Sequence, residues 1–393
     1  MECLLIGNPS RIRLVPRALP TKGYRKSLRS EVLKLGISKG GRKGIFPLCC
    51  FSFFDEDYSP YKAAMNLLNK DFITNYAEVS EWESGKSQET ILKNQGIMIR
   101  RRPPYGPPSH TVAPRNILEK IIWDKEVEVD QLKQRMPLDM ITEELKNAPP
   151  VRDFILALKF AHQQTFKPAL IAEVKKASPS SGVLREDFDP VQIALAYEKY
   201  GAACLSVLAD EKYFQGSYDN LEAIRRAGVE CPLLCKEFIV APWQVCYARL
   251  KGADAILLIA AVLANIEIKY VSMMCDKLGM AALVEVHNER EIDRVLGIEG
   301  IKLIGINNRD LGTFTVDISN TKKLLEGERG EIIRQKGITV VSESGLFTPQ
   351  DITFVQDAGA HAVLVGESLI KKEDPGMAIE EVFGIDVSLN SYL

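Results

Sequence analysis

Four charged residues of this chain lie in or directly after short apolar runs. Glu173 and Glu285 each lie within such a run, and Lys175 and Lys236 each follow one. A carboxylate in an apolar environment is costly unless a cation pairs with it, so the two lysines are the natural partners of the two glutamates. Ammonium groups and carboxylates that share a site can supply and remove protons within one reaction. These residue types therefore predict general acid–base chemistry.

Further polar side chains follow the other apolar runs. They are Asp210, Asn307 with Arg309, Glu343 with Ser344, and Glu367 with Ser368. Any one of these could be an ordinary solvated loop residue. Because such residues recur after successive runs, we expect them to meet at one site, provided that the runs are neighbouring strands.

Two glycine-containing stretches, "SESG" at 342–345 and "VGES" at 365–368, close the last two runs. Glycine lets the backbone approach a ligand closely. Backbone N–H groups that follow the last two strands of a barrel commonly bind phosphate. One end of the ligand is therefore expected to be a phosphate monoester.

These residues need a scaffold that brings the ends of many apolar runs together. Continuous apolar runs, unlike alternating ones, are typical of strands buried on both faces of a parallel sheet. Eight such runs, each followed by an amphipathic segment, span about 220 residues and predict an α/β fold, the closed (β/α)8 TIM barrel, with its active site at the C-terminal ends of the strands. The runs are 169–174, 204–209, 232–235, 255–260, 281–286, 302–307, 338–342 and 362–366.

An open, doubly wound sheet is the competing architecture. Such a sheet usually carries a glycine-rich nucleotide-binding loop after its first strand. No such loop follows residues 169–174. The barrel is therefore favoured.

The first fifty residues differ in charge from the remainder of the chain. Residues 1–50 contain eleven Lys or Arg and two Glu, a net charge of +9, so the remainder carries −11 of the total of −2. A basic stretch with scattered Ser, Gly and Pro and no continuous apolar core is typical of an organelle transit peptide and not of a secretory signal. The alternatives are a basic tail or a nucleic-acid-binding arm, and no aromatic-interleaved basic pattern supports the arm.

The next two segments are predicted to be a linker and the catalytic domain. Residues 51–113 are polar and include "IRRRPPYGPPSH", whose four prolines oppose a regular helix, so a linker is expected. Residues 114–393 are expected to form the TIM-barrel domain. It begins with an extra helix at about 115–135, where Ile117, Ile121 and other apolar residues recur at helical spacing. On periodicity alone, this helix either covers the substrate or closes the bottom of the barrel.

Composition argues against several kinds of partner. The longest strongly apolar stretch, Ala255 to Ala264, is about half of the roughly 20 residues that a membrane-spanning helix needs. The eight cysteines form no Cys-x-x-Cys motif and the four histidines are scattered, so no metal or cofactor is expected and the cysteines are predicted to be reduced core residues. We expect a phosphorylated small molecule as the ligand, and neither nucleic acid nor a membrane. The sequence does not indicate an oligomeric state.

With these motifs in view, the chain resembles indole-3-glycerol phosphate synthase in its plastid-targeted plant form. The most specific motif is "LIAEVKKASPSSGVL"; "LLCKEF", "LVEVH", "GINNRDL", "SESGLFT" and "LVGESL" follow in order, and the resemblance covers roughly residues 114 to 385. It implies conversion of 1-(2-carboxyphenylamino)-1-deoxyribulose 5-phosphate into indole-3-glycerol phosphate, carbon dioxide and water, without cofactor or metal. It also implies a place in the chloroplast stroma after removal of the transit peptide, and leaves room for contacts with other tryptophan-pathway enzymes.

The resemblance implies roles for individual residues. Lys236 corresponds to the general acid of ring closure, and Lys175 to a second lysine that contacts the substrate and is a candidate acid for the loss of water. Glu173 and Glu285 correspond to carboxylates that manage protons. Asn307 and Glu343 correspond to residues that orient the substrate hydroxyls and the lysines. The substrate-binding positions are Ser344, Gly345, Gly366, Glu367 and Ser368 at the phosphate, Ser178 and Pro179 near the aromatic carboxylate, and Phe238, Arg309 and Leu311 elsewhere in the pocket.

Three questions stay open at the level of sequence. The phosphoribosylanthranilate isomerase of the same pathway is the competing enzyme, although it lacks an "EVKKASPS" loop and typically relies on a Cys/Asp pair. A barrel retained as a binding scaffold is disfavoured, because all the charged strand-end groups are present, and the departures at Cys235 and Ala241 remove no catalytic group. Burial lowers the pKa of a lysine whereas carboxylates raise it, so the sign of the shift at Lys236 is not fixed.

Overall fold

The structure is a computed structural model that describes residues 88–102 and 113–384. The predicted transit peptide at 1–50 and the proline-rich stretch at 103–112 lie outside the described residues, as do residues 385–393. Among the helices in the described ranges, none is long and apolar enough to cross a membrane.

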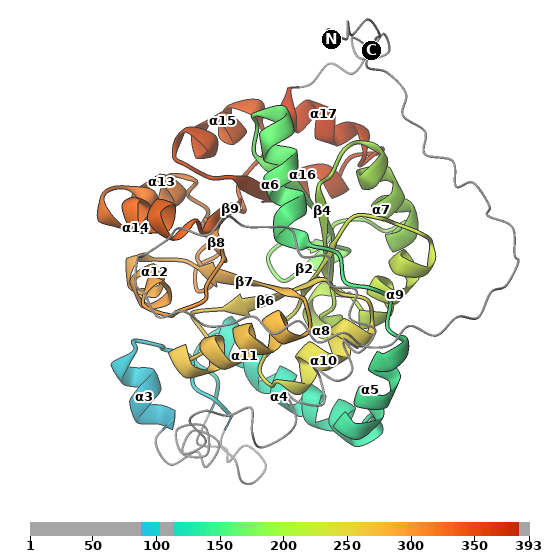
Figure 1. Ribbon diagram of the computed structural model, residues 1–393, viewed down its shortest axis with the longest axis vertical. Coiled ribbons are helices and arrows are strands. Elements are labelled where there is room, and N and C mark those ends of the chain that lie inside the picture. Colours follow the sequence, from blue (N-terminus) through green and yellow to red (C-terminus); the bar gives the residue numbers. More distant parts are fainter. Residues whose placement is uncertain (1–87, 103–112, 385–393) are drawn as a thin grey trace, which may run out of the picture. The chain divides into compact units, whose positions relative to one another are not determined.

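Eight parallel strands close into a barrel, in the order β1-β10-β9-β8-β7-β6-β5-β4. Figure 1 shows the strands in the interior, with helices around them. This confirms the predicted (β/α)8 fold, and the strand bounds agree with the predicted runs to within one or two residues. The strands are β1 Ala169–Val174, β4 Cys204–Leu208, β5 Leu233–Lys236, β6 Ala255–Ile259, β7 Ala281–Val286, β8 Leu303–Asn307, β9 Thr339–Glu343 and β10 Ala362–Val365.

The strands form because their residues are apolar on both sides. Every residue of β1, β4, β6, β8, β9 and β10 is buried. Burying a Leu, Ile or Val side chain contributes about 1.5 to 3 kcal/mol, which favours a sheet that is covered outside by helices and filled inside by side chains. The parallel register pairs Asn307 with Glu343 and Lys236 with Leu208, so polar residues that end different strands lie at the same level.

Helices that follow the strands cover the outside of the barrel (Figure 1). Several begin at side-chain caps: Asp189 caps α7, Asn288 caps α12 and Thr348 caps α15, which satisfies N–H groups that the helix itself leaves free. A short hairpin, β2 Ala177–Ser178 and β3 Gly182–Val183, forms in the loop after β1. The helices are α6 Phe154–Thr165, α7 Pro190–Lys199, α8 Glu211–Phe214, α9 Tyr218–Arg226, α10 Trp243–Leu250, α11 Asn265–Lys277, α12 Glu289–Leu296, α13 Ser319–Leu325, α14 Glu328–Lys336, α15 Pro349–Asp357, α16 Glu367–Ile370 and α17 Met377–Phe383.

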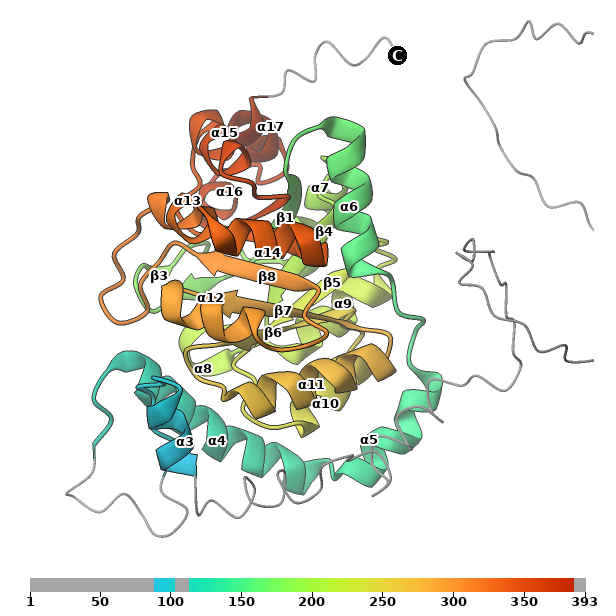
Figure 2. The ribbon, with the colours of Figure 1, turned by 60° about the vertical axis from the view of Figure 1, so that its left-hand side comes forward.

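The predicted extra helix is α4, Ile117–Arg135. It begins two residues later than expected because Asn116 caps it, accepting a hydrogen bond from the backbone N–H of Glu119. Helix α4 runs beside α10 and α11 in Figure 2. The short helix α5, Leu138–Glu144, and the 3-10 turn Leu145–Asn147 then lead to α6.

Part of the predicted linker is ordered structure. Within 51–113, residues 88–94 form helix α3, Gln88–Asn94, and the following segment contributes Ile97 and Ile99 to the buried core. Residues 88–102 of the predicted linker thus contain a helix and buried apolar side chains. The prolines that suggested a linker begin at 103, so their effect on local structure does not reach back to these residues.

The described cysteines agree with the expected reduced core residues. Cys204, Cys231, Cys235, Cys246 and Cys275 are all free and buried. Within the described ranges, no group of three or more His, Cys, Asp or Glu side chains is arranged to hold a metal ion.

Candidate active site

One cavity opens at the C-terminal ends of the barrel strands. The structure brings all sixteen predicted site residues to its walls. They come from β1 and the loop after it, from β5 with its loop, and from the ends of β7 to β10. The residues are Glu173, Lys175, Ser178, Pro179, Lys236, Phe238, Glu285, Asn307, Arg309, Leu311, Glu343, Ser344, Gly345, Gly366, Glu367 and Ser368.

The end of the first strand supplies an ion pair. Lys175 Nζ lies 2.5 Å from Glu173 Oε2, and the Glu173 side chain is almost completely buried. Burial raises the pKa of this carboxyl, but Lys175 and Lys236 outweigh that effect and lower it. A Cβ atom on Gly366 would overlap the Glu173 carboxylate, so glycine at the end of β10 makes room for the carboxylate.

A second group of charges surrounds Lys236 at the end of β5. Its Nζ lies 2.7 Å from Glu343 Oε2 and 3.5 Å from Glu285 Oε2. Burial lowers the pKa of Lys236, but the surrounding carboxylates, Glu343 and Glu285 foremost, raise it above its ordinary value. The direction of the pKa shift at Lys236, which the sequence left open, is therefore upward, and its ammonium group is charged at neutral pH.

The two glutamates that contact Lys236 differ in their proton affinity. Burial raises the pKa of Glu343 to about 7; Lys236 opposes the rise and Glu285 adds to it. Burial also raises the pKa of Glu285, but Lys236 and His287 more than reverse this and lower it. Of the two neighbouring carboxyls, Glu343 is therefore the one that takes up a proton first as pH falls.

Asn307 and His287 hold Glu285 in place. A hydrogen bond from the Asn307 side chain also lowers the pKa of Glu285, and Asn307 Oδ1 accepts a hydrogen bond from the backbone N–H of Arg309. His287 Nε2 lies 3.1 Å from Glu285 Oε1, and its Nδ1 lies 3.0 Å from Glu291 Oε2. Burial lowers the pKa of His287, but these two carboxylates raise it to about 10, so the imidazolium places a further positive charge beside Glu285.

The loops after β9 and β10 form another part of the cavity wall. Ser344 and Gly345 have φ angles of 68° and 80°, a left-handed conformation that costs a non-glycine residue about 1 to 3 kcal/mol. Such strain clusters at ligand sites. Glu367 lies between two cations, 3.7 Å from Arg309 and 2.6 Å from Lys371. The Ser368 hydroxyl donates to the Leu346 carbonyl.

The remaining wall is apolar. Helix α4 contributes Ile117, Leu118 and Ile121 to it, and Phe214 and Phe238 lie with ring centroids 6.1 Å apart. Of the two roles considered for the extra helix, covering the substrate is therefore the one that its first turns fit. The cavity has a charged centre, a glycine-rich side and an apolar side, which matches an anionic sugar with an aromatic group.

Sequence reasoning did not identify three residues at or beside this mouth, namely Lys125, Glu237 and His287. Lys125 of α4 is 2% exposed and contacts three carboxylates, at 2.9 Å from Asp210, 3.1 Å from Glu237 and 3.0 Å from Glu128. Glu237 lines the cavity, and burial raises its pKa to about 7 although Lys125 opposes the rise. Asp210, expected at the site, instead caps α8 and pairs with Lys125.

Only one of the missed residues had a readable signal. His287 follows Glu285 by two positions, which places both on the same side of an extended chain. Lys125 carried no such signal, since a single lysine in a helix is normally a solvated residue.

The chain is similar in sequence to enzymes that share one name. The family model described as indole-3-glycerol phosphate synthase matches residues 118–382. The chloroplastic indole-3-glycerol phosphate synthase of Arabidopsis thaliana is 60% identical over 327 residues, which cover 80% of this chain and 81% of that protein. The enzyme of the same name from Microcystis aeruginosa is 59% identical over 270 residues, or 69% of this chain and 90% of that protein. The one from Rippkaea orientalis is 55% identical over 271 residues, covering 69% and 91%.

Proposed function

The chain belongs to the indole-3-glycerol phosphate synthase family, and from this membership we propose how its side chains divide the family's reaction. Its activity is indole-3-glycerol phosphate synthesis in tryptophan biosynthesis. The substrate is 1-(2-carboxyphenylamino)-1-deoxyribulose 5-phosphate. The observation that carries the proposal is the pairing of each lysine at the mouth with its own carboxylates: Lys236 with Glu343 and Glu285, and Lys175 with Glu173.

Lys236 is the acid of ring closure. As the aromatic carbon that bears the carboxylate attacks the ketone carbon, the ketone oxygen gains negative charge and takes a proton from the Lys236 ammonium. Loss of carbon dioxide then restores the aromatic ring. Glu343 keeps the ammonium charged and directed at the mouth, at 2.7 Å.

Lys175 and the glutamates complete the reaction. The hydroxyl formed in ring closure leaves as water when Lys175 donates a proton to it. A carboxylate removes the last proton, which closes the indole double bond. Glu173 lies 2.5 Å from Lys175 and Glu285 lies 3.5 Å from Lys236, so each lysine has a carboxylate beside it that can take part in its reprotonation.

The two ends of the cavity hold the two ends of the substrate. The loops after β9 and β10, with Ser344, Gly345, Gly366, Glu367 and Ser368, bind the phosphate. The apolar wall of α4 and Phe238 contacts the aromatic ring, with Ser178 and Pro179 near its carboxylate. Arg309, Leu311 and Asn307 complete the middle of the pocket.

The competing enzyme of the same pathway has less support. It would use a cysteine as acid or base, and none of the five described cysteines lines the cavity. We also propose that the chain acts in the chloroplast stroma after removal of residues 1–50, because the relative from Arabidopsis thaliana is chloroplastic and this stretch is strongly basic.

A single assay tests the assignment of Lys236. The purified chain is expected to convert the carboxyphenylamino-deoxyribulose phosphate into a product with indole fluorescence. Lys236→Ala should lower kcat by about 10² to 10⁴, the usual contribution of a positioned acid, while circular dichroism stays that of the wild type. Lys176→Ala is the matched control, because Lys176 lies outside the cavity walls, and its kcat should change less than about threefold. Near-normal turnover of Lys236→Ala would remove Lys236 from this role.

A further inference from the structure

A short segment before helix α4 contacts the outside of the active-site wall. We call residues 97–102 the strap; they follow α3 and precede the residues that the family comparison matched, 118–382. Ile97 and Ile99 are buried, whereas Met98 is 71% exposed. The strap therefore packs against the protein with alternate side chains.

Two contacts anchor the start of the strap to the barrel helices. Gln95 Oε1 accepts hydrogen bonds from the backbone N–H of Asn265 and from Arg294, at 2.9 and 3.1 Å. Gly96 has a φ of +71°, and a Cβ atom there would overlap the Arg290 guanidinium. The turn that directs the strap toward α4 is thus tied to α11 and α12.

Arg100 binds the first turns of α4. Its backbone N–H and its Nε donate to Glu119 Oε1 at 2.9 and 2.8 Å, and its Nη2 donates to Glu119 Oε2 at 2.9 Å. Glu119 is completely buried. Trp123 returns a hydrogen bond from its indole N–H to the Arg100 carbonyl at 2.8 Å. Charge-assisted, bidentate hydrogen bonds to a buried carboxylate fix geometry more firmly than exposed ion pairs.

Arg101 joins three elements at once. It lies 3.2 Å from Glu126 of α4, donates to Glu267 of α11 at 2.7 Å, and donates to the Val240 carbonyl at 3.3 Å. Only 14% of its side chain is exposed. Val240 belongs to the loop after β5, and Gln244 fixes the same loop by accepting from the N–H of Val240 and donating to the Phe238 carbonyl.

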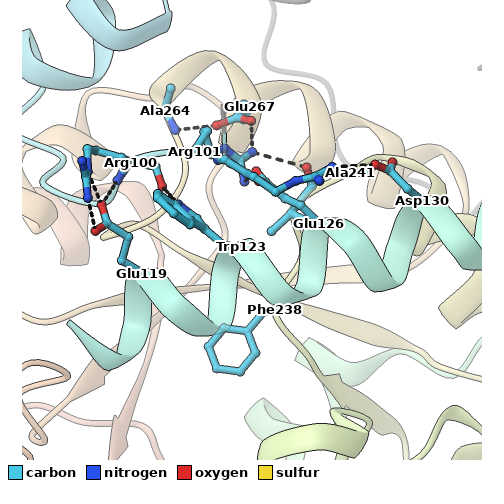
Figure 3. Close-up of polar contacts among 12 residues, drawn as sticks. Arg100, Arg101, Glu119, Trp123, Glu126, Asp130, Phe238, Ala241, Ala264 and Glu267 are labelled. Carbon is cyan, nitrogen blue, oxygen red and sulfur yellow. Dashed lines mark hydrogen bonds and ion pairs between the residues drawn. The ribbon is translucent and has the colours of Figure 1, made fainter. Parts of the chain in front are cut away.

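The elements that the strap binds also form the apolar wall of the active site. Figure 3 shows Arg100 and Arg101 on one side of α4 and Phe238 on the other. Ile117, Leu118 and Ile121 of α4 line the cavity together with Phe238. A shift of α4 or of the β5 loop would therefore move the surface assigned to the aromatic ring. The hydrogen bonds and ion pairs given above for Arg101 go to α4, α11 and the β5 loop, and none goes to the loops after β9 and β10.

We propose that the strap is a positioning element of the active site, and that Arg101 is its positioning residue for the aromatic end of the substrate. This inference rests on the proposed function of the cavity. Arg101 touches no reacting atom; it acts by holding α4, α11 and the β5 loop in one arrangement. Lysine cannot replace it fully, because a single ammonium does not reproduce the planar fork of guanidinium donors.

The test uses the full chain with Arg101→Ala and Arg101→Lys. KM for the carboxyphenylamino-deoxyribulose phosphate should rise about tenfold in Arg101→Ala while kcat falls less than about threefold, since a displaced wall weakens ground-state and transition-state binding alike. The inhibition constant of anthranilate, a probe of the aromatic end, should rise with KM. That of inorganic phosphate, a probe of the other end, should stay unchanged. Arg101→Lys should give intermediate values.

The matched control is Arg329→Ala. Arg329 also bridges carboxylates on a neighbouring helix, at 2.6 Å from Asp293 and 3.2 Å from Glu289, but these ion pairs involve neither the strap, nor α4, nor the β5 loop. Its KM should match the wild type. Unchanged KM in Arg101→Ala would overturn the inference, as would inhibition constants for anthranilate and phosphate that rise together. If Arg101→Ala does not fold, unchanged KM in Arg101→Lys overturns it. A wild-type chain without turnover would contradict the proposed function itself.

Discussion

Lys236 is charged because of its neighbours and in spite of its burial. Desolvation disfavours an ammonium, yet Glu343 and Glu285 raise the pKa of Lys236 above its ordinary value. Lys236 is therefore protonated throughout the neutral range, and in its proposed role as an acid it would not limit activity there. Two carboxyls of the cavity titrate within that range, Glu343 and Glu237, since burial raises the pKa of each to about 7. Glu343 is the one that pairs with Lys236.

The first prediction at this scale concerns the pH profile of kcat/KM, which reports the free enzyme. Glu343 is ionised above about pH 7 and becomes protonated below it, so the ion pair with Lys236 weakens as pH falls. We expect kcat/KM to decline on the acid side of about pH 7. In Glu343→Gln this decline should disappear, and the plateau should be lower by about 10², because the amide cannot hold the ammonium as the carboxylate does.

A matched variant separates this effect from general changes. Glu289→Gln alters a half-exposed glutamate of α12 and should leave the pH profile of the wild type intact. An acid-side decline that persists with the same midpoint in Glu343→Gln would assign that limb to another group.

Single residues differ in how far the sequence could assign them. Glu173 and Glu285 could be predicted, because a carboxylate inside an apolar run needs a partner and the run itself fixes its place on a strand. Lys125 could not, because its three carboxylate partners come from Glu128 on its own helix and from the ends of two strands, β4 and β5. The residues next to Lys125 in the sequence therefore do not indicate that it pairs with Asp210 and Glu237.

At the scale of elements, the strands position the charges and a few glycines make room for them. Gly305 lies within β8, opposite Glu285 of β7 in the parallel register. A Cβ atom there would overlap the Glu343 carboxylate. Because every residue of β8 is buried, the strand has little freedom to move away. The place of Glu343 beside Lys236 thus depends on the absence of a side chain from the neighbouring strand.

We therefore predict that Gly305→Ala inactivates the enzyme without unfolding the barrel. The added methyl group should displace Glu343, and kcat should fall by about 10², the usual effect of misplacing a catalytic group by roughly 1 Å. Gly297→Ala is the control, since Gly297 ends α12 with a φ of −77° that any residue adopts. Steady-state kinetics and the urea midpoint of unfolding measure both. Full activity in Gly305→Ala would show that Glu343 can shift without consequence.

The barrel could be predicted from the sequence, whereas the strap could not. Continuous apolar runs are typical of strands buried on both faces of a sheet, and eight of them in succession predict a closed barrel. Residues 88–102 carry mixed charges and lie before a proline-rich stretch, which resembles a linker. Residues distant in the sequence hold them in place. Arg101, for example, hydrogen bonds to Glu267, which is 166 positions away. Contacts at such separation leave no local periodicity.

At the scale of the whole molecule, charge is unevenly divided. Residues 51–393 carry −11, yet the cavity is expected to bind a phosphate and a carboxylate. The cavity is lined by three cations, Lys175, Lys236 and Arg309, and by five glutamates, so we expect single cations and backbone N–H groups to bind these anionic groups by direct hydrogen bonds. The +9 of residues 1–50 is not needed for that task and calls for a separate explanation.

We propose that the positive charge of residues 1–50 belongs to a transit peptide. A chain that begins at Phe51 after an added methionine should keep kcat/KM within about twofold of the full chain, since a transit peptide is removed from the mature protein. Isolated chloroplasts should import the full chain and fail to import the shortened one. A chain of full length with its eleven early Lys and Arg replaced by Gln is the control, because it separates charge from length. Import of the shortened chain, or loss of its activity, would contradict the transit function and assign these residues to the folded enzyme.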